Sequence, residues 1–103
     1  MKAETRMKFI ESAILKYGFI SRSLISSVFE ISEPQATRDL MCYRKLNDGL
    51  VFIESSKQWA KAENFEATKG LLHTTPDEFI SALEVVMGRK IQQVAVKTRL
   101  GAA

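Results

Sequence analysis

The chain has 103 residues, of which 46% are hydrophobic and 26% charged, and its formal net charge at pH 7 is +3. These values predict one small globular domain, and they argue against a disordered chain and against an independent enzyme with a deep cleft. Because no apolar run approaches the length of a membrane span and the N-terminus MKAETRMKF lacks the apolar core of a signal peptide, we expect a cytoplasmic protein.

The first predicted helix covers residues 4–17 and ends at Gly18, the residue type favoured just past a helix C-terminus. Phe19 and Ile20 then form only a short extended link. After it, Ser21 is placed to cap a second helix of about two turns. The expected apolar positions of that second helix are Leu24, Ile25, Val28 and Phe29.

A third helix is predicted over residues 33–46. Ser32 can cap it, Gln35 stands three residues on to complete a capping box, and Pro34 is tolerated in the first turn because an N–H there has no partner. The turn Asn47-Asp48-Gly49 is expected to end the helix. Its inward stripe is Ala36, Leu40 and Tyr43, and the side chains left toward solvent are Gln35, Thr37, Arg38, Met41, Arg44 and Lys45.

Two short β-type runs follow, over residues 50–53 and 58–60, and the turn 54–57 between them makes a β-hairpin. Trp59 is expected to pack in the hairpin across from Val51 or Ile53. Three helices followed by a hairpin is the winged form of helix-turn-helix, with the turn as the tip of the wing. The predicted fold class is therefore mainly α with a small β-hairpin.

A fourth helix is predicted after an irregular stretch over residues 61–74. It starts at Thr75, which forms a capping box with Glu78, and it ends at Gly88. The segment 89–103 carries only basic charge, and its pattern leaves a strand, a helix and a solvated tail open. The apolar positions of the fourth helix are Phe79, Ile80, Leu83, Val86 and Met87.

The order of caps, turn, polar helix face and hairpin indicates DNA binding. Gln35 can pair with adenine, Arg38 with guanine, and Thr37 with a phosphate or a thymine methyl, so these three are the predicted base readers. Hydroxyls, cations and helix N-termini favour phosphate. Glu33 and Asp39 repel phosphate unless an internal donor holds them. The residues predicted to contact DNA are Ser21, Arg22, Ser23, Pro34, Gln35, Thr37, Arg38, Arg44, Lys45, Ser56 and Lys57.

Each of these residues also has a plainer interpretation. The cations of the third helix would make an ordinary solvated face, Ser32 and Gln35 would serve only as caps, and Lys57 in a turn would only add solubility. Cys42 is the single cysteine, expected to be a buried or half-buried structural thiol, and His73, the single histidine, a solvated loop residue. We therefore expect no disulfide, no metal or cofactor site and no catalysis.

The second and third helices resemble a particular family. The chain is similar to the N-terminal domain of WYL-domain transcriptional repressors, which include bacterial regulators of phage-defence loci. The similarity covers roughly residues 6 to 66. The residues that carry it are Ile20-Ser21-Arg22, Leu24, Phe29-Glu30-Ile31-Ser32, Pro34-Gln35-Ala36-Thr37-Arg38-Asp39-Leu40 and Tyr43.

The resemblance implies a homodimer that binds inverted-repeat DNA, with the helix 33–46 in the major groove. Because 103 residues leave no room for the WYL sensor, it implies a stand-alone module of phage, plasmid or mobile-element origin. We divide the chain into a winged helix-turn-helix DNA-binding domain over residues 1–66 and a C-terminal helix with a basic tail over residues 67–103, the candidate dimerisation element.

We expect a transcriptional regulator, and a repressor in particular, because blocking a promoter needs no further surface. The alternative is a winged-helix module that holds a partner protein and never touches DNA. Exposed apolar residues on the third helix would favour that alternative, and Met41 is the only sizeable one placed there.

Overall fold

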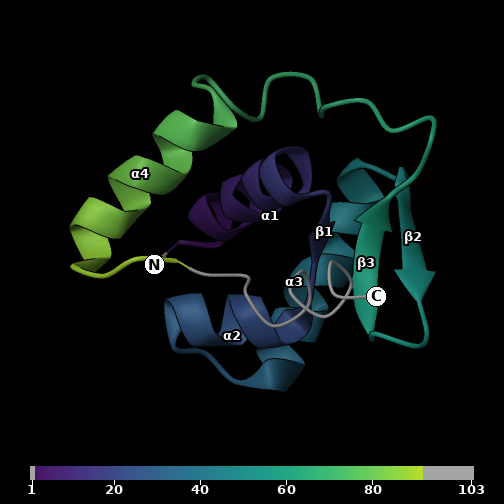
Figure 1. Ribbon diagram of the computed structural model, residues 1–103, viewed down its shortest axis with the longest axis horizontal. Coiled ribbons are helices and arrows are strands. Elements are labelled where there is room, and N and C mark those ends of the chain that lie inside the picture. Colours follow the sequence, from purple (N-terminus) through teal and green to yellow (C-terminus); the bar gives the residue numbers. More distant parts are fainter. Residues whose placement is uncertain (1, 92–103) are drawn as a thin grey trace, which may run out of the picture.

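The computed structural model describes residues 2–91. The first helix lies in the middle of the molecule, with the last helix packed along one side of it and the second and third helices on the other (Figure 1). A small sheet closes one end. Most of the basic segment 89–103 lies outside the described residues. The elements are α1 (Ala3–Tyr17), β1 (Phe19–Ile20), α2 (Arg22–Phe29), α3 (Glu33–Leu46), β2 (Leu50–Ile53), β3 (Gln58–Lys61) and α4 (Pro76–Met87).

The helix ends follow the local chemistry predicted for them. Gly18 adopts the left-handed conformation with φ 89° and its N–H donates to the carbonyl of Ile14, which ends α1. The hydroxyls of Ser21 and Ser32 accept from backbone N–H groups at 3.1 and 3.2 Å and cap α2 and α3. Thr75 forms the complete capping box of α4. At α3 the box is incomplete, because its third residue turns its side chain to other partners, described below.

The sheet has three strands, one more than predicted. Phe19–Ile20, expected to be only a link, pairs antiparallel with β3, so the strand order is β1-β3-β2 and β2 lies at the edge. The predicted hairpin is present, and its second strand runs one residue further, to Lys61. Trp59 pairs with Phe52, not with Val51 or Ile53, and their ring centroids are 4.9 Å apart. The four residues between the strands place position 53 opposite position 58, which fixes this register.

The core is built on the apolar face of α1. Ala36, Leu40 and Tyr43 turn inward as predicted and are buried against it. On α4 the buried side chains are Ile80 and Leu83. Phe79 and Met87 pack against the core in part.

One ion pair fastens α4 to α1. The ammonium of Lys16 lies 2.7 Å from a carboxylate oxygen of Asp77, and this hydrogen bond raises the pKa of Lys16. Val85 and Val86 are strongly exposed: Val85 lies on the side of α4 opposite its buried stripe, and Val86 lies at the edge of that stripe.

Glu11 is a fully buried carboxylate in the middle of the apolar face of α1. It accepts a hydrogen bond from the hydroxyl of Tyr43, and two more at 2.8 Å from the N–H and the hydroxyl of Thr68. A buried carboxylate is tolerated only when its acceptor sites are filled in this way. These bonds tie α1, α3 and the loop between β3 and α4 together.

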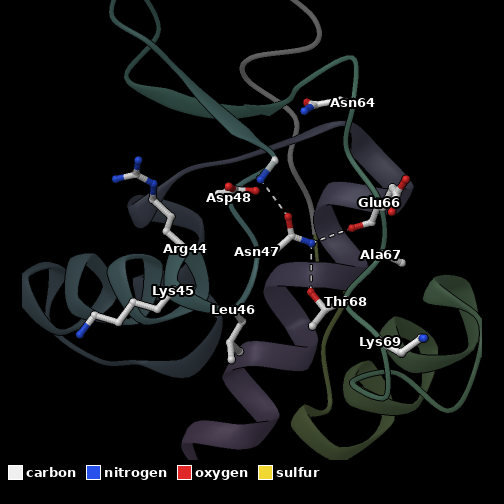
Figure 2. A pocket seen from close by; sticks show the side chains of 11 residues that line it. Arg44, Lys45, Leu46, Asn47, Asp48, Asn64, Glu66, Ala67, Thr68 and Lys69 are labelled. Carbon is white, nitrogen blue, oxygen red and sulfur yellow. Dashed lines mark hydrogen bonds between the residues drawn. The ribbon is translucent and has the colours of Figure 1, made fainter.

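Asn47 extends this attachment at the end of α3. Its amide N–H₂ donates to the carbonyl of Glu66 at 2.7 Å and to the hydroxyl of Thr68 at 3.0 Å, while its carbonyl accepts from the N–H of Gly49 (Figure 2). A β-carbon on Gly49 would lie 2.8 Å from the ring of Phe65, so the turn there requires glycine. The predicted irregular stretch is therefore held at defined points.

Replacing Tyr43 tests the buried cluster. Tyr43→Phe leaves the Glu11 carboxylate one donor short, and we expect the free energy of unfolding at pH 7 to fall by about 1–3 kcal/mol. Burial, followed by the bond to Glu11, raises the pKa of Tyr43 in the folded state. The hydroxyl of Tyr43 therefore loses its proton at a lower pH in the unfolded chain than in the folded protein. As the pH rises above about 10, the stability of the wild type declines.

Urea unfolding of both proteins between pH 7 and pH 11 checks this expectation. The gap between wild type and Tyr43→Phe should narrow as the pH rises. Equal stabilities at pH 7 would show that the bond from Tyr43 to Glu11 contributes nothing.

Candidate nucleic-acid interface

The start of α2, the middle of α3 and the β2–β3 hairpin meet around a groove of about 400 Å³. Thr37 and Met41 line it from α3, and Phe52, Lys57 and Trp59 line it from the hairpin. Arg22 closes the end at α2. The groove therefore brings together residues that the sequence placed in three separate segments.

Thr37 takes an unusual position in this groove. The residue is half-buried, but its hydroxyl oxygen is inaccessible and has no hydrogen-bond partner among the described residues. The part of Thr37 that reaches the surface is therefore not its hydroxyl. A contact made by this side chain would be an apolar one.

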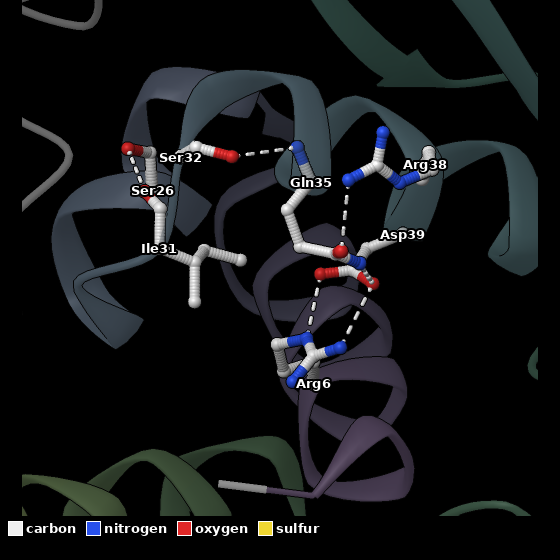
Figure 3. A network of polar contacts seen from close by, with 7 residues as sticks. All are labelled: Arg6, Ser26, Ile31, Ser32, Gln35, Arg38 and Asp39. Carbon is white, nitrogen blue, oxygen red and sulfur yellow. Dashed lines mark hydrogen bonds and ion pairs between the residues drawn. The ribbon is translucent and has the colours of Figure 1, made fainter.

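A polar network runs along the first turns of α3 (Figure 3). Asp39, only 4% exposed, is paired with Arg6 of α1 through contacts of 2.6 and 3.2 Å. The amide nitrogen of Gln35 donates to Asp39 at 3.1 Å, and its carbonyl oxygen accepts from Arg38 at 3.1 Å. Internal donors thus hold the carboxylate of Asp39, which is the condition set above for it not to repel phosphate. Arg38 itself is exposed.

The other carboxylate in the first turn of α3 also has internal partners. Glu33 lies 3.4 Å from the guanidinium of Arg22 and accepts from the hydroxyl of Ser23 at 3.3 Å. All three side chains are exposed. The start of α2 and the start of α3 are therefore joined by a carboxylate that an incoming anion could replace.

The hairpin turn carries a second exposed pair. Lys57 is bound to Glu54 within the same turn, and its backbone is left-handed with φ 57°. Beside it, Ser56 is half-buried. The left-handed backbone of Lys57 costs little for glycine or asparagine and more for other residues, so a substitution of Lys57 should use one of these two.

Arg44 links α3 to the hairpin. Its guanidinium lies over the ring of Trp59, 4.5 Å from the centroid, in a cation–π contact. Lys45 beside it is exposed, as is Pro34 in the first turn. Trp59 therefore has a second role besides packing in the hairpin, which the sequence does not indicate: its ring supports the guanidinium of Arg44.

Two expectations for this face need correction. Cys42 is exposed, not buried, because one residue before the inward-facing Tyr43 rotates its side chain about 100° around the helix. Leu46 is exposed as well as Met41, so Met41 is not the only large apolar residue that α3 presents. Three residues of the edge strand β2 are also exposed: Val51, Phe52 and Ile53.

Between residues 2 and 91, no three His, Cys, Asp or Glu side chains gather into a group that could hold a metal ion. None of the described helices is long and apolar enough to cross a membrane. His73 lies exposed in the loop before α4, as expected.

The chain matches a known protein family. Residues 2–85 match the family model of the BrxR transcriptional regulator winged helix-turn-helix domain. The matched segment continues past Phe65, where the resemblance seen in the sequence ended, and includes most of α4. No curated protein gives a significant match to the chain.

Removing the carboxylate of Asp39 tests the polar network. Asp39→Ala removes the carboxylate that pairs with the guanidinium of Arg6, a side chain only 13% exposed. We expect the free energy of unfolding to fall by about 3 kcal/mol, measured by chemical denaturation. Glu54→Ala is the matched control, because it breaks a pair whose side chains are 69% and 78% exposed. Its effect should stay below about 1 kcal/mol. Equal effects of the two substitutions would contradict a structural role for Asp39.

Proposed function

Because the chain belongs to the family of BrxR transcriptional regulator winged helix-turn-helix domains, we propose that it represses transcription by binding a specific double-stranded DNA site. In this proposal α3 enters the major groove and the hairpin turn lies along the adjacent backbone. As a regulator of transcription it would act in the cytoplasm and associate with the nucleoid when bound.

The division of α3 into two faces carries the proposal. Its inward side is buried against the core, while Arg38, Arg44 and Lys45 stand exposed on the remaining surface. A recognition helix needs this arrangement, because one face must be locked in place while the other presents polar groups to base edges.

Base reading is assigned to the first two turns of α3. Arg38 can donate two hydrogen bonds to guanine O6 and N7. Thr37 can offer its methyl group to thymine, since its hydroxyl is inaccessible. Gln35 can pair with adenine only by giving up its bonds to Asp39 and Arg38. Pro34 lies at the start of the same surface.

Phosphate contacts are assigned to the edges of this surface. At the start of α2, the residues are Ser21, Arg22 and Ser23, and a phosphate there would take the place of the Glu33 carboxylate. On the other side they are Arg44, Lys45, Ser56 and Lys57. Neutralising DNA phosphates with these cations would release the counterions of the phosphates, which makes binding sensitive to salt.

We further propose that the chain acts as a homodimer on an inverted repeat. Residues 1–66 would contact DNA, and residues 67–103 would join the two copies. The adjacent, exposed Val85 and Val86 of α4 support this assignment, because an interface there would remove two large apolar side chains from water. Two-fold symmetry would then place one copy of α3 on each half-site.

The alternative function, a protein-binding module, is supported by the exposed apolar residues of β2. DNA is favoured over it by the family and by the cations that flank the groove.

Fluorescence anisotropy against a site selected from random duplexes, and against a scrambled duplex, tests the proposed function. Arg38→Ala should relax specificity at one base pair, at a cost of about 1–3 kcal/mol. Lys57→Asn is the control, because asparagine tolerates the left-handed backbone while the substitution removes the ammonium group and its pair with Glu54. It should weaken all sequences alike and reduce the salt dependence. A chain that selects no site, or that binds every duplex equally, would contradict the proposal.

Sedimentation measures the proposed dimer. The wild-type chain at micromolar concentration should sediment as a dimer when bound to the selected site. Val85→Asp with Val86→Asp should shift it toward the monomer without unfolding it, since both side chains are exposed. Sedimentation as a monomer at these concentrations, with and without DNA, would remove this part of the proposal.

A further inference from the structure

We propose that Gln35 does not read a base but positions Arg38, and that the buried pair of Asp39 and Arg6 anchors it for this task. The inference rests on the proposed function, since it divides the work among residues on the face assigned to the major groove. It makes Arg38 the base reader at this point of α3 and makes Gln35, Asp39 and Arg6 positioning residues.

The orientation of the Gln35 amide follows from the chemistry of its two neighbours. The carboxylate of Asp39 can only accept hydrogen bonds, and the guanidinium of Arg38 can only donate them. The amide nitrogen must therefore face Asp39, at 3.1 Å, and the carbonyl oxygen must face Arg38, also at 3.1 Å. The reversed amide would place donor against donor and acceptor against acceptor. Gln35 thus has one favoured pose.

The anchor of this pose lies inside the domain. Asp39 is almost fully buried, and Arg6 reaches it from α1 with two of its nitrogens. Two contacts to one carboxylate fix both its position and its rotation. Because Arg6 lies on α1, at the centre of the core, it fixes Asp39, Asp39 fixes the amide of Gln35, and Gln35 in turn orients the exposed side chain of Arg38 (Figure 3).

The hydrogen bond that Arg38 donates to Gln35 leaves Arg38 able to read a base. It uses Nη2 of a guanidinium that carries five N–H donors, so donors for both guanine acceptors are still present. A long arginine side chain held in its binding pose loses less freedom on binding than an unsupported one. If Gln35 instead paired with adenine, Asp39 would lose a donor and Arg38 would lose its support.

The two roles of Gln35 predict different specificity profiles. We would measure anisotropy on the selected site and on every single base-pair substitution of it, for wild type, Gln35→Met, Arg38→Ala and the double variant. Methionine keeps the length and helix propensity of glutamine and removes its hydrogen bonds. Lys45→Met is the matched control on an exposed position of the same helix.

A positioning role predicts that Gln35→Met lowers discrimination at the base pair that Arg38→Ala affects, by about fivefold, and at no other. The double variant should then be no worse than Arg38→Ala alone. Arg6→Lys, a change on α1 that keeps the charge but not the two-nitrogen grip, should lower discrimination at that same base pair. Lys45→Met should weaken all duplexes equally. Thermal unfolding of each variant verifies that it is folded, and Gln35→Ala replaces Gln35→Met if that variant is not.

Loss of discrimination at a different base pair in Gln35→Met would overturn the inference, because Gln35 would then read a base itself. Unchanged discrimination would overturn it as well. Both results leave DNA binding by wild type intact, so they are distinct from failure of the proposed function, in which wild type itself shows no preference among duplexes.

Discussion

The ion pair between Arg6 and Asp39, together with the buried stripe of Ala36, Leu40 and Tyr43, holds α3 against α1. The apolar stripe of α3 is narrow, and burial alone would allow the helix some rotation about its axis. Asp39 removes that freedom, because its charge must meet the guanidinium on α1. One turn further along, Tyr43 meets the buried carboxylate of Glu11 in the same way. These two polar contacts lie four residues apart on α3 and five apart on α1. Together they fix the rotation and the register of α3 against α1. The start of α2, the groove and the hairpin are arranged around a helix held at these points.

Charge on the candidate interface is balanced more closely than the sequence alone indicates. Glu33 lies against Arg22, Glu54 against Lys57, and Asp39 against Arg6. The exposed pairs are weak and can be exchanged for phosphate, whereas the buried pair cannot. The candidate interface therefore contains two exposed ion pairs, whose anionic partner can change, and one buried ion pair, which is fixed. Under the proposed function, a protein of modest net charge would bind DNA in this way without a large positive potential, which would favour every duplex alike.

The parts of the fold that depend on neighbouring residues were predictable. Ser21, Ser32 and Thr75 cap helices through bonds that span three residues, and Gly18 ends α1 through its own backbone. The bonds from Thr68 to Glu11 span 57 residues, and no local pattern indicates them. The strand β1 is not indicated by the sequence for the same reason, since its two residues form a strand only when β3 lies beside them. At the candidate site, the residue types and faces were predictable, but the network around Gln35 depends on side-chain geometry that helical spacing leaves open.

The attachment of Thr68 to Glu11 also bears on how this domain can be moved between proteins. A fragment that ended at Phe65 would contain the helix-turn-helix and the complete hairpin, yet it would leave a carboxylate in its core without two of its donors. The loop after β3 is therefore an internal part of the fold and not a linker. A fusion or a recombination event that keeps the domain stable must carry this loop with it, and α4 together with the loop, because α4 covers α1. The segment that must be kept together for a stable fold is thus longer than the helix-turn-helix and hairpin that form the candidate interface.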